Sequence, residues 1–138
     1  MSPKSVLTVS AILFLLHGIG FFLGAEEIAK LGAGEISELA LKVGKGNNEI
    51  VAMFNLFGAF LMFAARGLDV PAARAVTKGA AIGYLVLFAG IIYHMQTLVP
   101  LQQPPLPAAL VFALIALWAT YVGWIQKDNA PTTADSAS

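Results

Sequence analysis

The sequence contains no cysteine and few charged residues. The absence of cysteine excludes disulfide bonds, zinc–thiolate sites and thiol nucleophiles. Asp, Glu, Lys and Arg make up 12% of the 138 residues, and the formal net charge is zero. That charged fraction is about half the share found in ordinary soluble domains. Because the sequence also lacks a basic block, nucleic acid is not an expected partner.

Apolar residues take the place of the missing charge and make up 58% of the chain. A soluble domain of this length buries only about two thirds of the surface that its unfolded chain exposes. Too much apolar surface would therefore face water, and we expect lipid to cover it. The sequence predicts an all-α membrane protein with one domain over 1–127 and a disordered polar tail over 128–138.

Four long apolar stretches are candidates for membrane-spanning helices: 5–25, 49–65, 79–99 and 106–126. Each is long enough to cross a hydrocarbon core at the rise of an α-helix. We therefore predict four transmembrane helices in a compact bundle. The first stretch is interpreted as an uncleaved helix, because its apolar part is longer than that of a signal peptide.

The connection over 25–48 carries a pattern of its own. Ile36, Leu39 and Val43 fall at helical spacing, with charged residues on the opposite face. This pattern predicts a short amphipathic helix over 33–44 that lies on the outer membrane surface, between breaks at "LGAG" and "GKGNN". Such a helix would lie over the outer mouth of the bundle and could act as a lid.

The distribution of basic residues predicts the orientation. Five basic residues lie on the side of the loop between the second and third spans, against three on the opposite side: Lys4, Arg66, Arg74, Lys78 and Lys127 against Lys30, Lys42 and Lys45. By the positive-inside rule, both termini face the cytoplasm. We expect a plasma (inner) membrane or an endoplasmic reticulum membrane.

Small residues in the spans predict how the helices pack. Helices in lipid associate where small side chains let their backbones come close. The candidate contacts are Gly20-x-x-x-Gly24 in the first span, Gly79-x-x-x-Gly83 in the third, and an alanine stripe in the fourth. These patterns favour a bundle, and they also offer faces that could dock other membrane subunits or a second copy of the chain.

Polar residues inside the spans are the candidate functional groups, because an intramembrane polar group is costly and usually faces the bundle interior. His17 shares the face of its helix with Ser10 and Gly20. His94 in the third span and Asn55 in the second are predicted to converge with His17 in the outer half of the bundle, with Glu49 at the mouth. Each also has a purely structural interpretation. His17 and Asn55 could serve as hydrogen-bonded packing contacts, His94 could meet headgroup water, and Glu49 could favour a helix start after two asparagines.

The functional interpretation gives these residues roles. A histidine suits acid–base chemistry near neutral pH, so the predicted catalytic residues are His17, His94 and Glu49. The predicted ligand-binding residues are Asn55, Gly20, Gln96 and Tyr93, and no metal site is predicted. Haem ligation by the two histidines and quinone binding stay open as alternatives, and no cofactor is required.

Two segments, "LFLLHGIGFFLG" and "EIVAMFNLFGAFLMFAARGLDVPAARAV", carry a resemblance to a known group. The chain resembles the DoxX-like superfamily of small four-helix membrane proteins. The matching positions are the His17–Gly18 pair, Glu49, Gly58 and Arg66. The resemblance implies a four-helix bundle and a role as an accessory in membrane redox assemblies.

Two functions therefore follow from the sequence. The first is an integral membrane protein whose outward-facing polar pocket binds a lipophilic small molecule and acts on it by acid–base chemistry. The second is a non-catalytic accessory or assembly subunit of a membrane complex, docked through the small-residue stripes, above all the alanine stripe of the fourth span.

Overall fold

The computed structural model describes residues 2–31, 36–97 and 106–126, and these residues form helices and turns only. The elements are α1 (Pro3–Leu23), α2 (Ala25–Lys30), α3 (Glu38–Ala65), α4 (Val70–Thr97), α5 (Leu106–Thr120) and the π-helical turn η1 (Tyr121–Ile125). The all-α prediction is confirmed. The predicted tail over 128–138 and the proline-rich connection over 98–105 lie outside the described residues.

Three helices are long and apolar enough to cross a membrane: Pro3–Leu23, Glu38–Ala65 and Val70–Tyr93. The fourth predicted span is a shorter apolar helix over Ala109–Ile125. Large apolar side chains cover the outside of these helices, and Leu16 and Phe54 are 61% and 71% exposed. An exterior of this kind needs a lipid environment, because soluble proteins rarely leave such continuous apolar surface in water.

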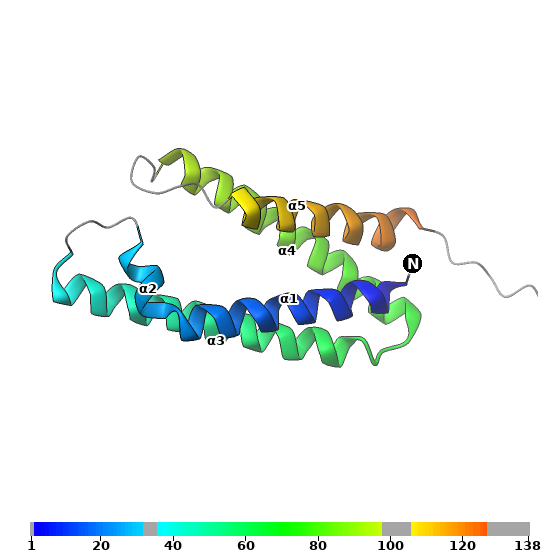
Figure 1. Ribbon diagram of the computed structural model, residues 1–138. Helices are drawn as coiled ribbons and strands as arrows, with labels where there is room; N and C mark the ends of the chain where they lie inside the picture. The colour runs from blue at the N-terminus through cyan, green and yellow to red at the C-terminus, as the bar shows by residue number, and fades with distance from the viewer. Residues whose placement is uncertain (1, 32–35, 98–105, 127–138) are drawn as a thin grey trace, which may run out of the picture.

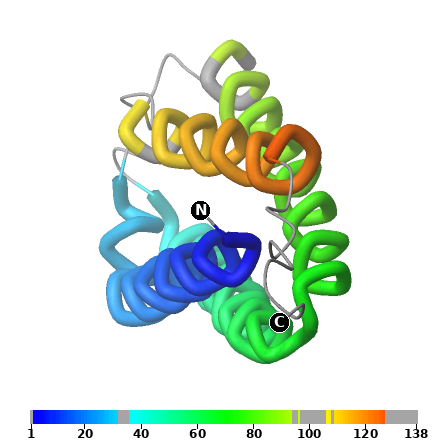
Figure 2. Tube along the Cα trace, turned by 90° about the vertical axis from the view of Figure 1, so that its right-hand side faces the viewer, coloured from blue at the N-terminus to red at the C-terminus, as the bar shows by residue number. Residues whose placement is uncertain are grey.

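The helices form two antiparallel pairs (Figure 1). α1 packs along α3, and α4 packs along α5, while α1 also contacts α4. The view along the bundle in Figure 2 shows the two pairs separated on the side where α1 faces α5. Few contacts join α1 to α5, and α3 and α4 touch at most sparsely. The bundle is therefore closely packed within each pair and open between the pairs.

Small residues allow the helices to approach closely. On α1 and α4, however, these small residues are not the glycines of the two Gly-x-x-x-Gly motifs. A Cβ atom on Gly18 would come within 2.9 Å of the Leu56 side chain and 3.1 Å of the Ala52 carbonyl oxygen on α3. Gly20, Gly79 and Gly83 have no such neighbours within 4 Å among the described residues. The Gly20-x-x-x-Gly24 and Gly79-x-x-x-Gly83 predictions are therefore wrong as helix contacts within the chain.

The alanine stripe of the fourth span is confirmed as a packing face. Ala109, Ala116 and Ala119 on α5 are buried, and Gly123 in η1 lies against the Lys78 stem. Ala119 packs with Val6 of α1 and Ala81 of α4 in a buried cluster. Since this stripe is used within the chain, it is not the free docking face that we predicted for other subunits.

The amphipathic surface helix predicted over 33–44 is wrong as a separate element. Residues 38–44 form the start of α3, which continues through "GKGNN" without a break to Ala65. The short α2 lies between the first two spans instead. A lid over 33–44 consequently has no basis in the described residues, because most of that segment belongs to a spanning helix.

Packing against α2 explains why the glycines fail to break α3. A glycine costs a helix roughly 1 kcal/mol relative to alanine, which tertiary contacts readily outweigh. A Cβ on Gly44 would lie 3.0 Å from the Ala29 side chain, so the small residue permits close approach. Asn48 donates a hydrogen bond from Nδ2 to the Ala25 carbonyl oxygen at 2.9 Å. The true start of α3 is capped by Ser37, whose hydroxyl accepts from the Ala40 amide.

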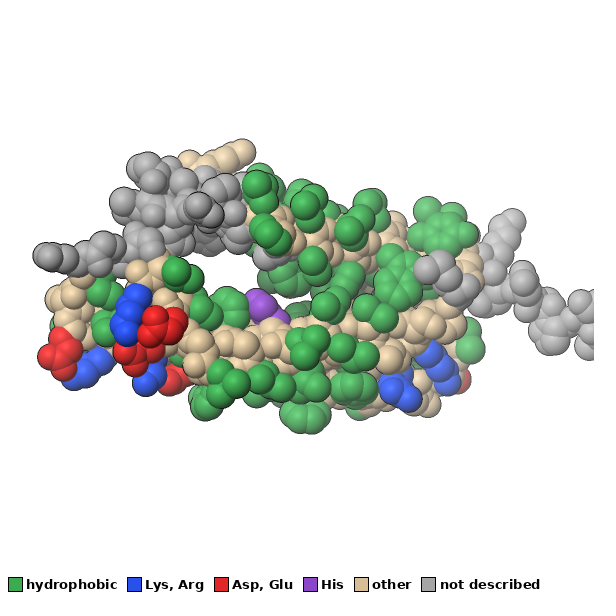
Figure 3. All heavy atoms as spheres, in the orientation of Figure 1, with side chains coloured by type: hydrophobic (Ala, Val, Ile, Leu, Met, Phe, Trp, Pro, Cys, Tyr) green, Lys and Arg blue, Asp and Glu red, His purple; other side chains and the backbone are tan. Residues whose placement is uncertain are grey.

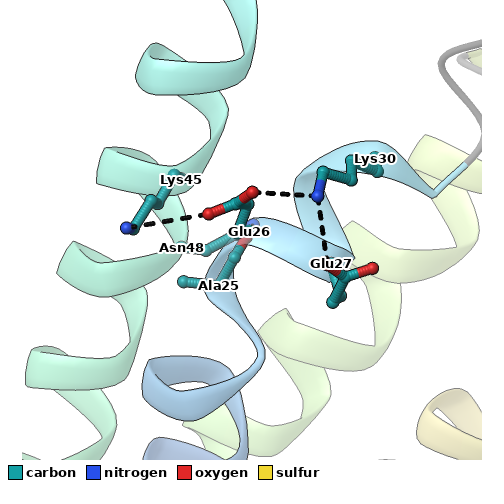
Figure 4. A network of polar contacts seen from close by, with 6 residues as sticks. All are labelled: Ala25, Glu26, Glu27, Lys30, Lys45 and Asn48. Carbon is teal, nitrogen blue, oxygen red and sulfur yellow. Dashed lines mark hydrogen bonds and ion pairs between the residues drawn. The ribbon is translucent and has the colours of Figure 1, made fainter.

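Charged side chains gather at the two ends of the molecule, with an apolar belt between them (Figure 3). At the α2 end, Glu26 pairs with Lys30 at 2.8 Å and with Lys45 of α3 at 3.9 Å (Figure 4). Lys30 also donates to Glu27. The hydrogen bond and positive charge of Lys30 lower the pKa of Glu26, and the hydrogen bonds to Glu26 and Glu27 raise the pKa of Lys30. This bipolar arrangement is typical of a membrane-spanning bundle.

Candidate functional site

A cavity of about 250 Å³ lies between the two helix pairs, where α1, α4 and α5 meet. Its walls are mostly apolar. The lining residues are Ser10, Leu13, Phe14 and His17 of α1, Tyr84 of α4, and Pro107, Val111, Phe112 and Ile115 of α5. The hollow between the α1 layer and α5 is visible in Figure 3.

His17 contributes an imidazole ring to the cavity wall, and one of its two ring nitrogens has no hydrogen-bond partner among the described residues. The Nδ1 atom is buried and has no hydrogen-bond partner within the described part of the chain. Its ring lies 4.4 Å from the Phe21 ring, centroid to centroid, at an interplanar angle of 53°. A buried polar atom without a partner costs free energy that a bound ligand could recover by supplying a hydrogen bond.

Two hydroxyl groups share the cavity with His17. Ser10 lies on the same helix face, as the spacing of the two residues predicts. The second hydroxyl is that of Tyr84 on α4. No hydrogen bond of ordinary distance and angle satisfies either one within the described residues. The cavity therefore combines apolar walls with three buried polar atoms that still have bonding capacity.

Aromatic rings form one boundary of the cavity. Tyr84 stacks on Phe14 at 5.9 Å and on Phe112 at 6.2 Å between ring centroids. Phe14 and Tyr84 also line a second, more open groove of about 620 Å³ on the other side, together with Met62 and Gly83. The Phe14–Tyr84 pair thus separates the cavity from the groove that lies between α3 and α4.

The structure does not bring Asn55 and Glu49 to this cavity. The Asn55 side chain donates from Nδ2 to the carbonyl oxygen of Val51 at 2.7 Å, one turn earlier on its own helix. Glu49 is half-buried in the middle of α3, so it does not follow a helix start as its two preceding asparagines suggested. Neither residue lines the cavity. The predicted convergence of Asn55 with His17 is therefore not found.

Three other predicted site residues, Gly20, Tyr93 and Gln96, do not line the cavity either. Gly20 is exposed and open on its Cβ side. Tyr93 and Gln96 are exposed near the end of α4. The backbone of His94 belongs to α4, but its side chain lies outside the described residues, so haem ligation by the two histidines stays a prediction. No three histidine, cysteine or carboxylate side chains of the described ranges come together as a metal-ligating group.

Sequence reasoning missed Tyr84 as a site residue. Tyr84 directly follows Gly83, the second glycine of the motif that we singled out in the third span. It is 3% exposed, and it carries the one polar side-chain atom that α4 contributes to the cavity among its described residues. An aromatic hydroxyl inside an apolar span was a signal of the same kind as His17 itself.

Comparisons with known proteins identify no relative of this chain. No family model matches it, and neither a curated protein nor a solved structure matches it. The resemblance to the DoxX-like superfamily therefore stays a prediction. The fold and the cavity are the observations from which a function can be inferred.

Proposed function

We propose that this membrane protein binds a lipophilic small molecule with one or two polar groups in the cavity between α1, α4 and α5. The observation that carries the proposal is the set of three unsatisfied buried polar atoms on one apolar cavity: His17 Nδ1, Ser10 Oγ and Tyr84 Oη. Ligand sites typically combine apolar walls with a few polar groups that fix the orientation of the ligand.

The size of the cavity narrows the class of ligand. A volume of about 250 Å³ lies slightly below the range of roughly 300–1,000 Å³ for typical small-molecule sites. It suits a substituted ring or a short chain segment. A longer molecule would extend through the open side between α1 and α5, where the two helices make few contacts.

Acid–base chemistry by His17 is the more specific form of this proposal. An imidazole can give or take a proton near neutral pH, and a hydroxyl beside it can hold a substrate oxygen. His17 would be the proton-transferring group, while Ser10 and Tyr84 would orient the ligand. Glu49 and Asn55 take no part in this version, because neither lines the cavity.

The test uses protein purified in a neutral detergent, followed by organic extraction and mass spectrometry of the bound molecule. We expect a lipophilic compound at about one per chain in the wild type and its loss in His17→Leu, with the melting temperature retained. Tyr84→Phe should weaken retention by roughly three- to tenfold, which corresponds to one lost hydrogen bond. Tyr93→Phe is the matched control, since Tyr93 is exposed and lies off the cavity.

Two results would contradict the proposal. One is a wild-type extract that contains no stoichiometric compound. The other is a His17→Leu protein that retains the same compound as the wild type. A His17→Leu protein that loses thermal stability without a separate loss of ligand would mark His17 as a packing residue.

The alternative function, a non-catalytic accessory subunit, rests on a different face. Gly79 and Gly83 on α4 have open space beside them and line the second groove. A helix of another membrane subunit could approach closely there. Co-purification of a second membrane protein that Gly83→Leu abolishes, together with an empty cavity, would favour this function over ligand binding.

A further inference from the structure

Among the described residues, the end of the molecule opposite α2 holds four basic side chains, and they fall into two groups. Arg74 donates from one guanidinium nitrogen to the Val122 and Gln126 carbonyl oxygens, and Lys78 lies 5.8 Å from the centre of the Trp124 ring. Both therefore hold η1, which continues α5. Lys4 and Arg66 lie on a separate surface. The start of α1 and the end of α3, from which these two residues come, lie side by side in Figure 1.

This separate surface is an open groove of about 550 Å³, which we name the basic groove. It is lined by Lys4, Ser5, Thr8, Val9, Arg66 and Gly67. All four ion pairs of the described residues involve Lys30, Lys42 or Lys45, so neither Lys4 nor Arg66 has a carboxylate partner there. Arg66 does lie over the Phe63 ring at 5.9 Å.

The nearest carboxylate in the sequence is already engaged. Asp69 caps α4, where its side chain accepts a hydrogen bond from the Ala72 amide at 2.8 Å. Two cations thus face one concave surface with no carboxylate partner among the described residues, which is the electrostatic complement of a phosphate group.

Apolar surface continues from the basic groove along both helices. On α1, Ile12 and Leu16 follow Val9 on the same face by helical spacing, and they are 43% and 61% exposed. On α3, Phe60 lies one turn before Phe63, over whose ring Arg66 lies, and Phe60 is 66% exposed. A ligand bound here therefore meets positive charge at the end of the helices and apolar surface along them. This is the order of groups in a phospholipid.

We infer that the basic groove binds the phosphate headgroup of an anionic phospholipid, whose acyl chains lie along α1 and α3. The leaflet follows from the distribution of charge, because the basic end is the one that the positive-inside rule places in the cytoplasm. Cytoplasmic leaflets carry the anionic lipids, and clusters of Lys and Arg at this depth bind them. The groove is separate from the cavity of His17, so the inference does not depend on the ligand proposed there.

The experiment compares phosphatidylglycerol with phosphatidylcholine, which have similar acyl chains but different headgroup charge. The purified protein in neutral detergent is mixed with equal amounts of both lipids, and native mass spectrometry measures the ratio of the two singly bound forms. We expect a preference for phosphatidylglycerol in the wild type. Lys4→Ala/Arg66→Ala should reduce it about tenfold or more, since each basic residue near an anionic headgroup contributes about fivefold.

Lys42→Ala/Lys45→Ala is the matched control, because it removes the same charge at the opposite end. The control should keep the preference. The charge-preserving pair Lys4→Arg/Arg66→Lys should keep it as well, which separates charge from a defect in folding. An unchanged preference in Lys4→Ala/Arg66→Ala, or an equal loss in the control, would overturn the inference.

Inorganic phosphate distinguishes the lipid from a soluble anion. At ionic strength matched with chloride, millimolar phosphate should leave phosphatidylglycerol in place, because the acyl chains contribute to its binding. Displacement of phosphatidylglycerol by phosphate under these conditions would make the basic groove a site for a free anion and would overturn the lipid assignment.

Discussion

The two faces of α1 meet their neighbours in opposite ways. Toward α3, Gly18 allows the backbones to come so close that an added methyl group would collide with Leu56 and the Ala52 carbonyl. Toward α5, one residue earlier in the chain, His17 lines a cavity with its Nδ1 unsatisfied. The same helix is thus a close-packed support on one side and a cavity wall on the other, and a rigid support is what a binding site requires.

The largest expected loss of stability comes from a substitution on the face of α1 that packs closely against α3. Gly18→Val should lower the free energy of unfolding by about 3 kcal/mol, because the Ala52 carbonyl oxygen is backbone and cannot move aside. Gly20→Val is the matched control and should change it by less than about 1 kcal/mol, since its side chain would enter open space. Thermal unfolding in detergent measures both. Equal destabilisation of the two variants would contradict the comparison.

A smaller loss of stability should follow when the segment formed by α5 and η1, which lies across the cavity from α1, is released at its end. Arg74 holds η1, the turn that continues α5, through the Val122 and Gln126 carbonyl oxygens. Arg74→Met should therefore destabilise the chain by about 2 kcal/mol, the size of a hydrogen bond to a charged group. Hydrogen exchange should show the loss of protection in the final turn of α5 and little change in α1 or α3. Uniform loss across all helices would contradict this local role.

The smallest effect concerns the exposed ion pairs of α2, two of which lie within that helix while one joins it to Lys45 of α3. Lys30 holds the pKa of Glu26 below its ordinary 4.5, so these contacts stabilise α2 above that pH and are lost as the pH falls through the lowered value. The pKa of Lys30 is raised above 10.5, so its contribution is present below 10.5 and lost as the pH rises through the raised value. We expect amide protection factors in α2 to fall on acidification in wild type but not in Glu26→Gln. High salt should shrink the difference, because all these groups are exposed.

The sequence was most informative where the relevant contacts are local. The shared face of Ser10 and His17 follows from helical spacing alone, and both residues do line the cavity. The apolar runs likewise predicted helices, because length and composition determine that a span can form. The fourth run, predicted over 106–126, forms α5 and the π-helical turn η1, which together extend from Leu106 to Ile125.

The errors concern contacts that depend on a partner helix. Gly18 and Gly20 lie about 200° apart on the helix, so only one of them can face α3, and the sequence motif favoured the wrong one. Asn55 was predicted to reach across the bundle, but the carbonyl oxygen of Val51 lies within reach on its own helix. The segment "GKGNN" has the composition of a helix break, but Gly44 and Asn48 within it contact α2 and the helix continues. Local spacing cannot distinguish these cases, because each depends on which helix lies opposite.

The hydrogen bonding of Arg74 to the Val122 and Gln126 carbonyl oxygens, just after α5, has a mechanical consequence. It fixes α5 at one end, whereas Pro107, which lines the cavity, lies near the other end, about 22 Å away along the helix. A rotation of about five degrees around the fixed end would displace Pro107 by about 2 Å, given that length. A rotation about the fixed end would thus move the cavity wall at Pro107 further than the wall at Ile115, which lies nearer to that end.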